Sequence, residues 1–563
     1  MTARGELVDE NAADLVVRGA RIWTQDPERP WAQALVVRDG VIVAVGSDEA
    51  AVDHIGPGTE VVELNGAMVM PGLSEGHVHL YMGGSQAAFE LPVLPTDGID
   101  DVLTKVRAWS GRLGPDEWVV GGILGATLID TLADRRHLRR LDEAGGGRPV
   151  LLRDDSMHNR WVNSKALALM GVGPATPDPE GGRYVRDEDG QLTGVLHELA
   201  CTVAEGAFAA SLTEPGARTR TAVATALEML NSYGITSAQD ALTMGPTYAA
   251  LRELERTGEL TARVVASMPV RPSLLEQGQV GDELIEIVMA DPGELVRPAF
   301  VKVFLDGVPM TRTTALLEPY LCSHGQKPGT GELLWTLEDL VTQVEKCYEL
   351  GLGAKFHATG DASVRLVLDA VHRVRDERGP GPRFEIAHVE FVHPDDIARF
   401  AGLDVAADAS PFIWFPSVLQ ESIQQQVPAP LVEASWPFRS LLDAGATVAA
   451  GSDWPCAALT PDPWVGMQTM VTRQNPDPTV TGSLNQAQAL TLEEAITAFT
   501  SAPARAMGLG EVTGRLKRGY SADFIVLDHD LFDVDISRVH ATRVLRTYFA
   551  GRLVHHTAPS HER

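Results

Sequence analysis

Two histidines that stand two residues apart are the first residues whose spacing could support chemistry. His77 and His79 lie in PGLSEGHVHL, residues 71–80, directly after the apolar run Ala67 to Met70. On an extended strand, residues i and i+2 share a face, so both imidazoles would point to one side and could seat one metal ion. In a chain with 16 histidines one such pair also arises by chance. The pair therefore needs support from other residues.

That support comes from further apolar, strand-like runs, each of which delivers a group that can bind metal. They are AFVKVFLDG with Lys302, AKFHATGD with His357, FEIAHVE with His388 and VAAGSDWP with Asp453. Any one of these residues could stand at its position by chance, but chance is a poorer explanation for the whole set. The set predicts a site for two divalent metal ions, and zinc is the ion that histidine ligands suit best.

Lys302 is an unusual residue for such a site, because burying an unpaired ammonium is costly. If its amine reacts with carbon dioxide, the product is a carbamate with one oxygen for each metal ion. That anion would also offset the repulsion between the two ions. The structural alternative is that Lys302 caps its strand or pairs with Asp306.

Asp453 is expected at the end of the last strand, since Trp454 and Pro455 follow it. One carboxylate oxygen could bind metal while the other takes a proton from a metal-bound water, which makes Asp453 a candidate general base. A turn-forming aspartate is the alternative. Trp414, Phe415 and Trp454 are candidates for an apolar substrate-binding wall, although aromatic residues beside strands more often belong to the core.

The elements that would position these side chains alternate between strands and helices, the order typical of parallel βα units. The number of strand-like runs, eight, is the number that closes a (β/α)8 barrel of the TIM type. In such barrels the chemistry lies at the C-terminal ends of the strands, where the residues above are found. The predicted strands are 67–80, 234–240, 263–269, 299–305, 353–357, 384–389, 403–409 and 446–453.

The rest of the chain divides around this barrel, predicted over residues 67–509. Short β-rich runs in residues 1–66 and 510–563 predict a small β-sandwich assembled from both chain ends, the first part as an antiparallel sheet. Residues of about 81–230 are too many for one βα connection and predict an inserted subdomain. Within it, LLRDDSMHNRWVNSKALALMGV should begin as a strand and continue as a helix with Asn163 as N-cap, leaving His158 exposed on the turn before it.

Composition excludes several classes of function. The chain has 563 residues, a net charge of −29 and a pI near 4.9, which argues against a nucleic-acid partner. The four cysteines have no Cys-x-x-Cys spacing, so no disulfide framework or thiolate zinc site is indicated. No export signal and no apolar run of about 18 residues is present, which predicts a cytoplasmic protein without a membrane partner. The expected partner is a small-molecule substrate, and a homodimer is compatible with the sequence.

The order of these motifs resembles the amidohydrolase superfamily, and more narrowly its amidohydrolase-3 branch, which includes N-substituted formamide deformylases. The resemblance covers nearly the whole chain and includes TGVLHE, LTLEEAITAFTSAPARAMG and GRLKRGYSADFIVLD. It implies that His77 and His79 hold one metal, His357 and His388 the other, that Lys302 bridges them as a carbamate and that Asp453 ligates and transfers protons. It also implies that His158 contacts the substrate.

The chain departs from the branch pattern at several positions. Glu75 stands where an aspartate is more usual, the motif I-E-H-A-Q reads Ile386 to Glu390 as IAHVE, and His158 is displaced by one residue. The leading functional hypothesis is hydrolysis of an amide or N-formyl C–N bond by a metal-bridging hydroxide. A decarboxylase or isomerase using the same site, and a metal-free binding protein on the barrel, remain the alternatives.

Overall fold

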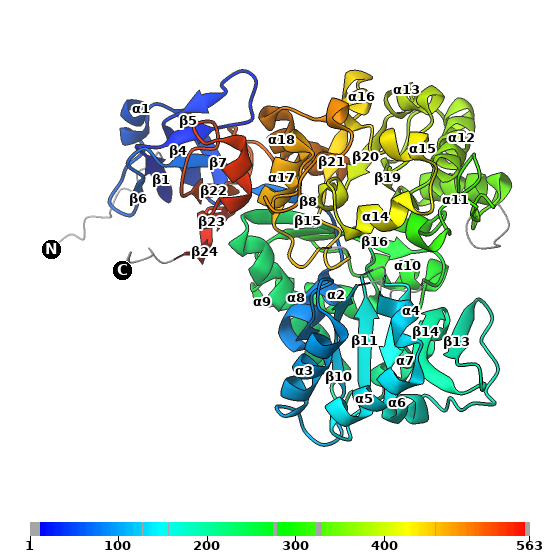
Figure 1. The fold of residues 1–563 in the computed structure, drawn as a ribbon. Helices are drawn as coiled ribbons and strands as arrows, with labels where there is room; N and C mark the ends of the chain where they lie inside the picture. The colour runs from blue at the N-terminus through cyan, green and yellow to red at the C-terminus, as the bar shows by residue number, and fades with distance from the viewer. Residues whose placement is uncertain are drawn as a thin grey trace.

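Parallel strands, each followed by helical structure, form the centre of the computed structural model, which describes residues 12–125, 128–155, 157–273, 278–322, 329–456 and 458–557. The 8-stranded sheet runs in the order β21-β20-β19-β18-β17-β16-β15-β8 (Figure 1). This confirms the predicted (β/α)8 fold. The strands are β8 Leu73–Val78, β15 Ile235–Asp240, β16 Arg263–Pro269, β17 Val296–Phe304, β18 Gly353–Ala358, β19 Phe384–His388, β20 Val405–Ala409 and β21 Val448–Ala450.

Helices cover the outside of this sheet and bury their apolar faces against it. The periodic run after Thr336 forms α11, in which the Thr336 side chain accepts a hydrogen bond from the Asp339 N–H and Gly351 ends the helix at φ 67°. The helices associated with the barrel are α2 Leu80–Phe89, α8 Pro215–Ser232, α9 Gly245–Thr257, α10 Gly281–Met289, α11 Leu337–Leu350, α12 Asp361–Arg378, α13 Pro394–Gly402, α14 Val418–Gln424, α15 Ala429–Glu433, α16 Phe438–Asp443, α17 Pro463–Thr472, α18 Leu492–Ala498 and α19 Ser501–Ala506.

The first and last strands of the barrel meet through the segment that follows β21. The Asp453 N–H donates to the His77 carbonyl at 2.7 Å, and the His79 N–H donates to the Trp454 carbonyl at 2.9 Å. Gly451 permits this approach, since a Cβ there would lie 2.2 Å from the His77 nitrogen. The contact places Asp453 directly beside the histidine pair.

The predicted first barrel strand, 67–80, is in fact two strands that belong to different sheets. Residues Met68–Pro71 form β7, which pairs with β2 and β22 outside the barrel, and the barrel strand β8 starts only at Leu73. The chain crosses over at Gly72, whose N–H donates to the Asp523 carbonyl and whose Cβ position is occupied by Thr236. The dipeptide Pro71-Gly72 stands at this break, but the residues on both sides of it are buried, so the apolar pattern continues from Ala67 to Leu73.

The two chain ends build two sheets that pack beside the barrel. One has the order β5-β4-β1-β6 and the other β24-β23-β22-β7-β2-β3. The first is not wholly antiparallel as expected, because β1 pairs with β6 in parallel. The strands are β1 Leu15–Arg18, β2 Arg21–Trp23, β3 Trp31–Ala32, β4 Ala34–Arg38, β5 Val41–Gly46, β6 Glu60–Glu63, β22 Phe524–Leu527, β23 Val544–Phe549 and β24 Arg552–His556, and the short helix α1 Asp48–Val52 follows β5.

The segment between the first two barrel strands contains a sheet with its own apolar core. Helices α2 and α8 pack together next to the barrel, and the sheet lies between them in sequence, drawn mainly in cyan below the barrel in Figure 1. Its order is β13-β14-β12-β11-β10-β9. The elements are β9 Leu91–Pro92, α3 Ile99–Ser110, β10 Val119–Leu124, α4 Ile129–Leu132, α5 Arg135–Gly145, β11 Val150–Asp154, β12 Asn159–Val162, α6 Ser164–Leu169, β13 Gly182–Arg186, β14 Leu192–Glu198 and α7 Ala200–Ala210.

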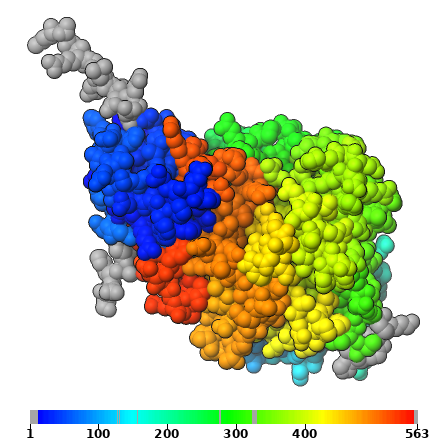
Figure 2. Space-filling view, turned by 90° about the horizontal axis from the view of Figure 1, so that it is seen from above, coloured from blue at the N-terminus to red at the C-terminus, as the bar shows by residue number. Residues whose placement is uncertain are grey.

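The space-filling view shows the N-terminal and C-terminal segments, blue and red, in contact at one end of the molecule (Figure 2). This agrees with the pairing of β22 with β7. In the described ranges, no helix combines the length and apolar character needed to cross a bilayer.

Candidate metal centre and active site

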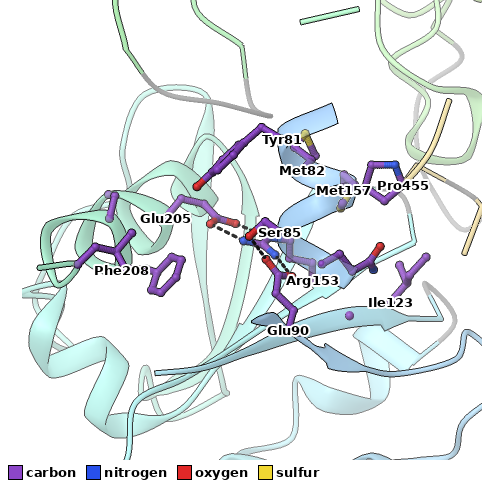
Figure 3. A pocket seen from close by; sticks show the side chains of 16 residues that line it. Tyr81, Met82, Ser85, Glu90, Ile123, Arg153, Met157, Glu205, Phe208 and Pro455 are labelled. Atoms are coloured by element: carbon purple, nitrogen blue, oxygen red, sulfur yellow. Dashed lines mark hydrogen bonds and ion pairs between the residues drawn. The ribbon is translucent and has the colours of Figure 1, made fainter. Parts of the chain in front are cut away.

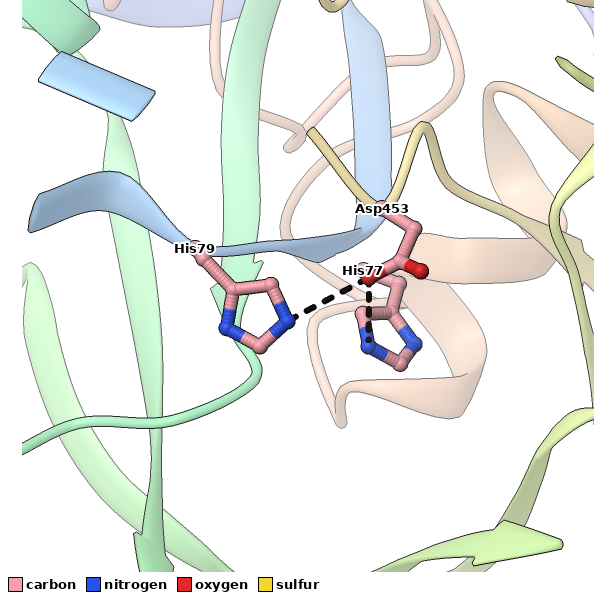
Figure 4. Close-up of side chains that lie close together, drawn as sticks. All are labelled: His77, His79 and Asp453. Carbon is pink, nitrogen blue, oxygen red and sulfur yellow. Dashed lines mark ion pairs between the residues drawn. The ribbon is translucent and has the colours of Figure 1, made fainter. Parts of the chain in front are cut away.

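Asp453 and the histidine pair lie together at the C-terminal end of the barrel (Figure 4). The Asp453 Oδ1 atom is 3.4 Å from His77 Nε2 and 3.2 Å from His79 Nε2. Ligands bound tetrahedrally to zinc at about 2.0–2.1 Å are about 3.3 Å apart. These three donor atoms therefore fit one metal ion, and all lie within 4.8 Å of one another.

The second histidine pair lies against the same carboxylate. His388 Nδ1 is 4.0 Å from the other Asp453 oxygen, Oδ2, and the His357 and His388 rings are 4.5 Å apart between centroids. The His357 Nε2–H donates to the Gly307 carbonyl at 3.1 Å, so Nδ1 keeps the lone pair that a metal requires. His357 and His388 therefore offer a second pair of imidazoles beside His77, His79 and Asp453.

Two of these residues have a positive φ, which is rare for residues other than glycine. His388 has φ 74° and Asp453 has φ 57°, and each stands at or just past the end of its strand. Such conformations cost about 1–3 kcal/mol and persist where the surrounding structure imposes them. Here they turn both side chains toward the common centre, which is a functional reason for the strain.

Lys302 is buried within hydrogen-bonding range of His77. It is 1% exposed, and its Nζ is 3.5 Å from His77 Nε2. Burial, and then the positive charge of Lys355, lower the pKa of Lys302 to about 8. The alternative partner Asp306 instead accepts hydrogen bonds from Ala315, Thr359, Gly360 and Ser363. A larger share of this amine is therefore neutral near pH 7 than for an exposed lysine, and the neutral amine is the nucleophilic form.

A chain of buried charges supports His77 from the side facing away from the centre. His77 Nδ1 is 2.7 Å from Asp408 Oδ2, and Lys355 Nζ is 2.6 Å from both Asp408 Oδ2 and Glu385 Oε2. An Nδ1–H donated to Asp408 leaves the His77 Nε2 lone pair for a metal. The sequence interpretation missed this network, although Lys355 shares a strand face with His357 two residues later.

Glu75 connects the two sides of the seam, which is where β8 meets the segment after β21. It does so through backbone N–H groups and not through the histidine rings. Its Oε1 accepts the His77 N–H at 3.0 Å and the Ser452 N–H at 2.7 Å. Burial raises the pKa of Glu75 to about 8 despite these hydrogen bonds. Glu75 therefore supports the backbone on either side of the metal ligands.

His158 reaches the site from the inserted segment. The stretch predicted as strand then helix forms β11, β12 and α6, and Asn163 caps α6 as predicted by accepting the Ala166 N–H. His158 lies on the turn before β12 and is half-buried, not exposed as expected. Its Nδ1 is 2.9 Å from Glu198 Oε2, which orients the ring.

A cavity of about 670 Å³ opens over these residues, between the strand ends of the barrel and the inserted segment. All six predicted ligands and His158 line it. The expected wall of Trp414, Phe415 and Trp454 does not, because Trp414 and Trp454 are fully buried in the core. Its apolar wall is formed by Leu199, Val203, Phe304, Val308, Pro309, Met310, Leu334, Ile413, Leu419 and Ile423.

A second cavity of about 170 Å³ lies between α2 and the inserted sheet, and Met157 lines both cavities (Figure 3). Its charged side chains are already paired. Arg153 binds Glu90 through Nη1 and Glu205 through Nε at 2.9 Å, and Arg160 binds Glu205 at 2.7 Å. This ion network joins the inserted sheet to α2.

The comparisons with known proteins agree with this geometry. The chain is 28% identical to the N-substituted formamide deformylase of Arthrobacter pascens, covering 96% of this chain and 98% of that one. It is also 28% identical to Bacillus subtilis YtcJ, covering 95% and 98%. A metal-dependent hydrolase from Pyrococcus horikoshii has the same fold, with a TM-score of 0.74 at 23% identity over 93% of this chain and 99% of that one.

A family model described as "Amidohydrolase family" matches residues 60–555, a range that contains the barrel, the inserted segment and, of the terminal sheets, the strands β6, β7, β22 and β23 and most of β24. Because this match spans most of the sequence, the chain belongs to the amidohydrolase family.

Proposed function

We propose that this protein hydrolyses an amide or N-formyl C–N bond in a small molecule that carries an apolar substituent. The observation that carries the proposal is the convergence of His77, His79 and His388 on the two oxygens of Asp453, with Lys302 Nζ 3.5 Å from His77 Nε2, beneath one cavity. The relative from Arthrobacter pascens is named for the deformylation of N-substituted formamides, which supports this bond type.

The metal ions, Asp453 and His158 would each have a different role in the reaction. Divalent ions bound there would polarise the substrate carbonyl and lower the pKa of a water molecule. Asp453 is placed to take a proton from the attacking water and to pass it to the leaving nitrogen. His158, oriented by Glu198, faces the same cavity and would bind the carbonyl or the leaving group.

The proposal includes two zinc ions and a carbamate on Lys302. Five nitrogen or oxygen side chains besides Lys302 are more than one tetrahedral ion needs. Asp453 presents Oδ1 to His77 and His79 and Oδ2 to His388, and Lys302 lies beside His77 with a lowered pKa. A bridging anion at that position would complete both ions.

The test uses the purified full chain loaded with zinc and N-hexylformamide as substrate. We expect equimolar formate and hexylamine, with labelled oxygen from isotopic water in the formate. Metal analysis should give about two zinc ions per chain. His77→Ala and His357→Ala should lose turnover and zinc while their circular dichroism spectra stay unchanged, because each change removes a ligand and little core packing.

Two results would overturn the proposal. Product formed without uptake of labelled oxygen would assign the site to a non-hydrolytic reaction. Full turnover in the zinc-free protein or in His77→Ala would remove the metal centre from the mechanism.

A further inference from the structure

Glu390 is a buried acid that faces the active-site cavity without a partner for its Oε1. The residue is 3% exposed and lines the cavity, and Oε1 has no hydrogen-bond partner among the described residues. Asp306, whose charge acts on the Glu390 carboxyl group, is itself an acid and cannot neutralise it. A buried polar group without a partner is costly, so such a group at a cavity wall indicates a ligand that completes it.

Backbone hydrogen bonds hold the main chain at Glu390 beside the cavity. His388 and Val389, with φ 74° and 48°, turn the chain sharply at the end of β19. The Glu390 carbonyl then accepts the Trp436 N–H at 2.8 Å, and the Phe391 N–H donates to the Thr359 carbonyl at 2.9 Å. The main chain at Glu390 is therefore held in place, and burial of the side chain limits the positions that its carboxyl group can take.

The other residues that line the cavity indicate which kind of ligand would fit. Lys302 is the single lysine or arginine among the described lining residues, and it belongs to the metal centre. Carboxylates are more numerous, and Ile413, Leu419 and Ile423 provide apolar surface. This wall favours an apolar chain that ends in a nitrogen donor and opposes a substrate that carries a carboxylate. The lining carboxylates besides Glu390 and the centre itself are Asp155, Glu180, Glu198, Asp306 and Glu332.

We propose that Glu390 determines specificity by accepting a hydrogen bond from an ammonium or N–H group at the far end of the substrate's substituent. The preferred substrates are then N-acyl or N-formyl derivatives of diamines with an apolar spacer. This inference rests on the proposed hydrolysis of a C–N bond. A carboxyl oxygen can accept such a bond in either protonation state, so the recognition needs no particular charge on Glu390.

The test compares matched formamides that differ only at the far end. N-(5-aminopentyl)formamide carries an ammonium group where N-hexylformamide carries a methyl group, and 6-formamidohexanoate carries a carboxylate at the same end. The shorter pair N-(3-aminopropyl)formamide and N-butylformamide samples a second distance. The kcat/KM ratio of ammonium to methyl substrate is measured for wild type, Glu390→Met and Glu390→Gln.

The control variant is Glu421→Gln, which removes an exposed carboxylate from the same helix, α14, that carries Leu419 and Ile423 into the cavity. We expect wild type to prefer the ammonium substrate of at least one pair and to turn over the carboxylate substrate least. Glu390→Met should lower the ammonium-to-methyl ratio by roughly 10- to 100-fold, and Glu390→Gln by less, because glutamine keeps one acceptor oxygen. Glu421→Gln should leave the ratio unchanged.

Other outcomes separate this inference from the proposed function. Equal kcat/KM for both members of each pair, or an unchanged ratio in Glu390→Met, would overturn the role of Glu390 while hydrolysis stands. Loss of zinc from Glu390→Met would overturn it too, because Glu390 would then be a metal ligand. If the zinc-loaded wild type turns over none of the formamides, the proposed function fails. Calorimetric binding of the same pairs to wild type and Glu390→Met then decides the inference by the same ratio.

Discussion

At the residue scale, the geometry of one carboxylate organises the centre. Asp453 presents Oδ1 to His77 and His79, and Oδ2 to His388. Its positive φ holds the side chain in this position, and its backbone N–H is bound to the His77 carbonyl. A residue so placed can bind metal with one oxygen and move a proton with the other.

Asp453→Asn separates these two roles. Asparagine keeps the size and one metal-directed oxygen but cannot accept a proton, so zinc content should fall modestly and single-turnover hydrolysis roughly a hundredfold or more. Both are measured on the same zinc-loaded preparation. Full zinc content together with more than about a tenth of the wild-type rate would assign proton transfer elsewhere, with His158 as the next candidate.

Lys302→Ala tests the bridging anion. Removing the side chain would delete the proposed carbamate and leave a space beside His77, so zinc content and turnover should both fall. Acetate or propionate should restore part of the activity, because a short carboxylate supplies the missing oxygens. Formate release is measured across a carboxylate concentration series, with chloride at equal ionic strength as the control. Restoration by chloride alone would contradict the carbamate.

At the element scale, the seam between β8 and the segment after β21 brings together ligands that are far apart in sequence. Glu75 receives hydrogen bonds from both sides of this seam, from His77 and from Ser452. The close approach depends on Gly451, which lies against the His77 backbone. The distance between Asp453 and the histidine pair is therefore a property of the two segments together.

Gly451→Ala should open the seam. The added Cβ would lie 2.2 Å from the His77 nitrogen and 2.6 Å from Glu75 Oε1, so the two segments must move apart. A displacement of the ligands by about 1 Å should lower kcat/KM roughly a hundredfold. Gly402→Ala is the matched control, because no atom lies within 4 Å of a Cβ at that position. Wild-type activity in Gly451→Ala would show that the seam does not set the ligand geometry.

At the scale of the whole molecule, the inserted segment supplies one wall of the cavity and must stay docked on the barrel. Arg153 of β11 connects Glu90, next to α2, with Glu205 of α7. Burial alone would raise the pKa of Glu205, but the charges of Arg153 and Arg160 outweigh it and lower the pKa to about 2. The network therefore stabilises this docking while Glu205 is ionised.

Glu205→Gln should loosen the inserted segment. Leaving buried arginines without their acid should cost about 3 kcal/mol or more, measured as urea unfolding or as proteolysis within this segment. Because the pKa is depressed, the stabilisation is full above pH 4.5 and is lost as the pH falls toward 2. Glu143→Gln, at an exposed position, is the control. Parallel stability profiles for wild type and Glu205→Gln across this pH range would contradict the prediction.

The sequence by itself determined the barrel, the approximate positions of its strands and the types of residue at the strand ends. Alternating apolar patterns and chain connectivity are local properties, and parallel strands present their C-terminal ends at one edge. His77, His79, Lys302, His357, His388 and Asp453 could therefore be predicted to share one end of the barrel without any distance being known. The helix cap at Asn163 is local in the same way and was predicted correctly.

Only the tertiary structure decided which groups contact one another across that end. The break of 67–80 into two strands, the support of His77 by Asp408 and Lys355, and the cavity wall without Trp414 all depend on packing between distant segments. Sequence patterns show whether a residue is apolar or polar, but they do not show which neighbour packs against it or forms its hydrogen bond. Glu390 shows the difference, because the sequence gives its position after β19, while the lack of a partner for its Oε1 among the described residues follows from tertiary packing.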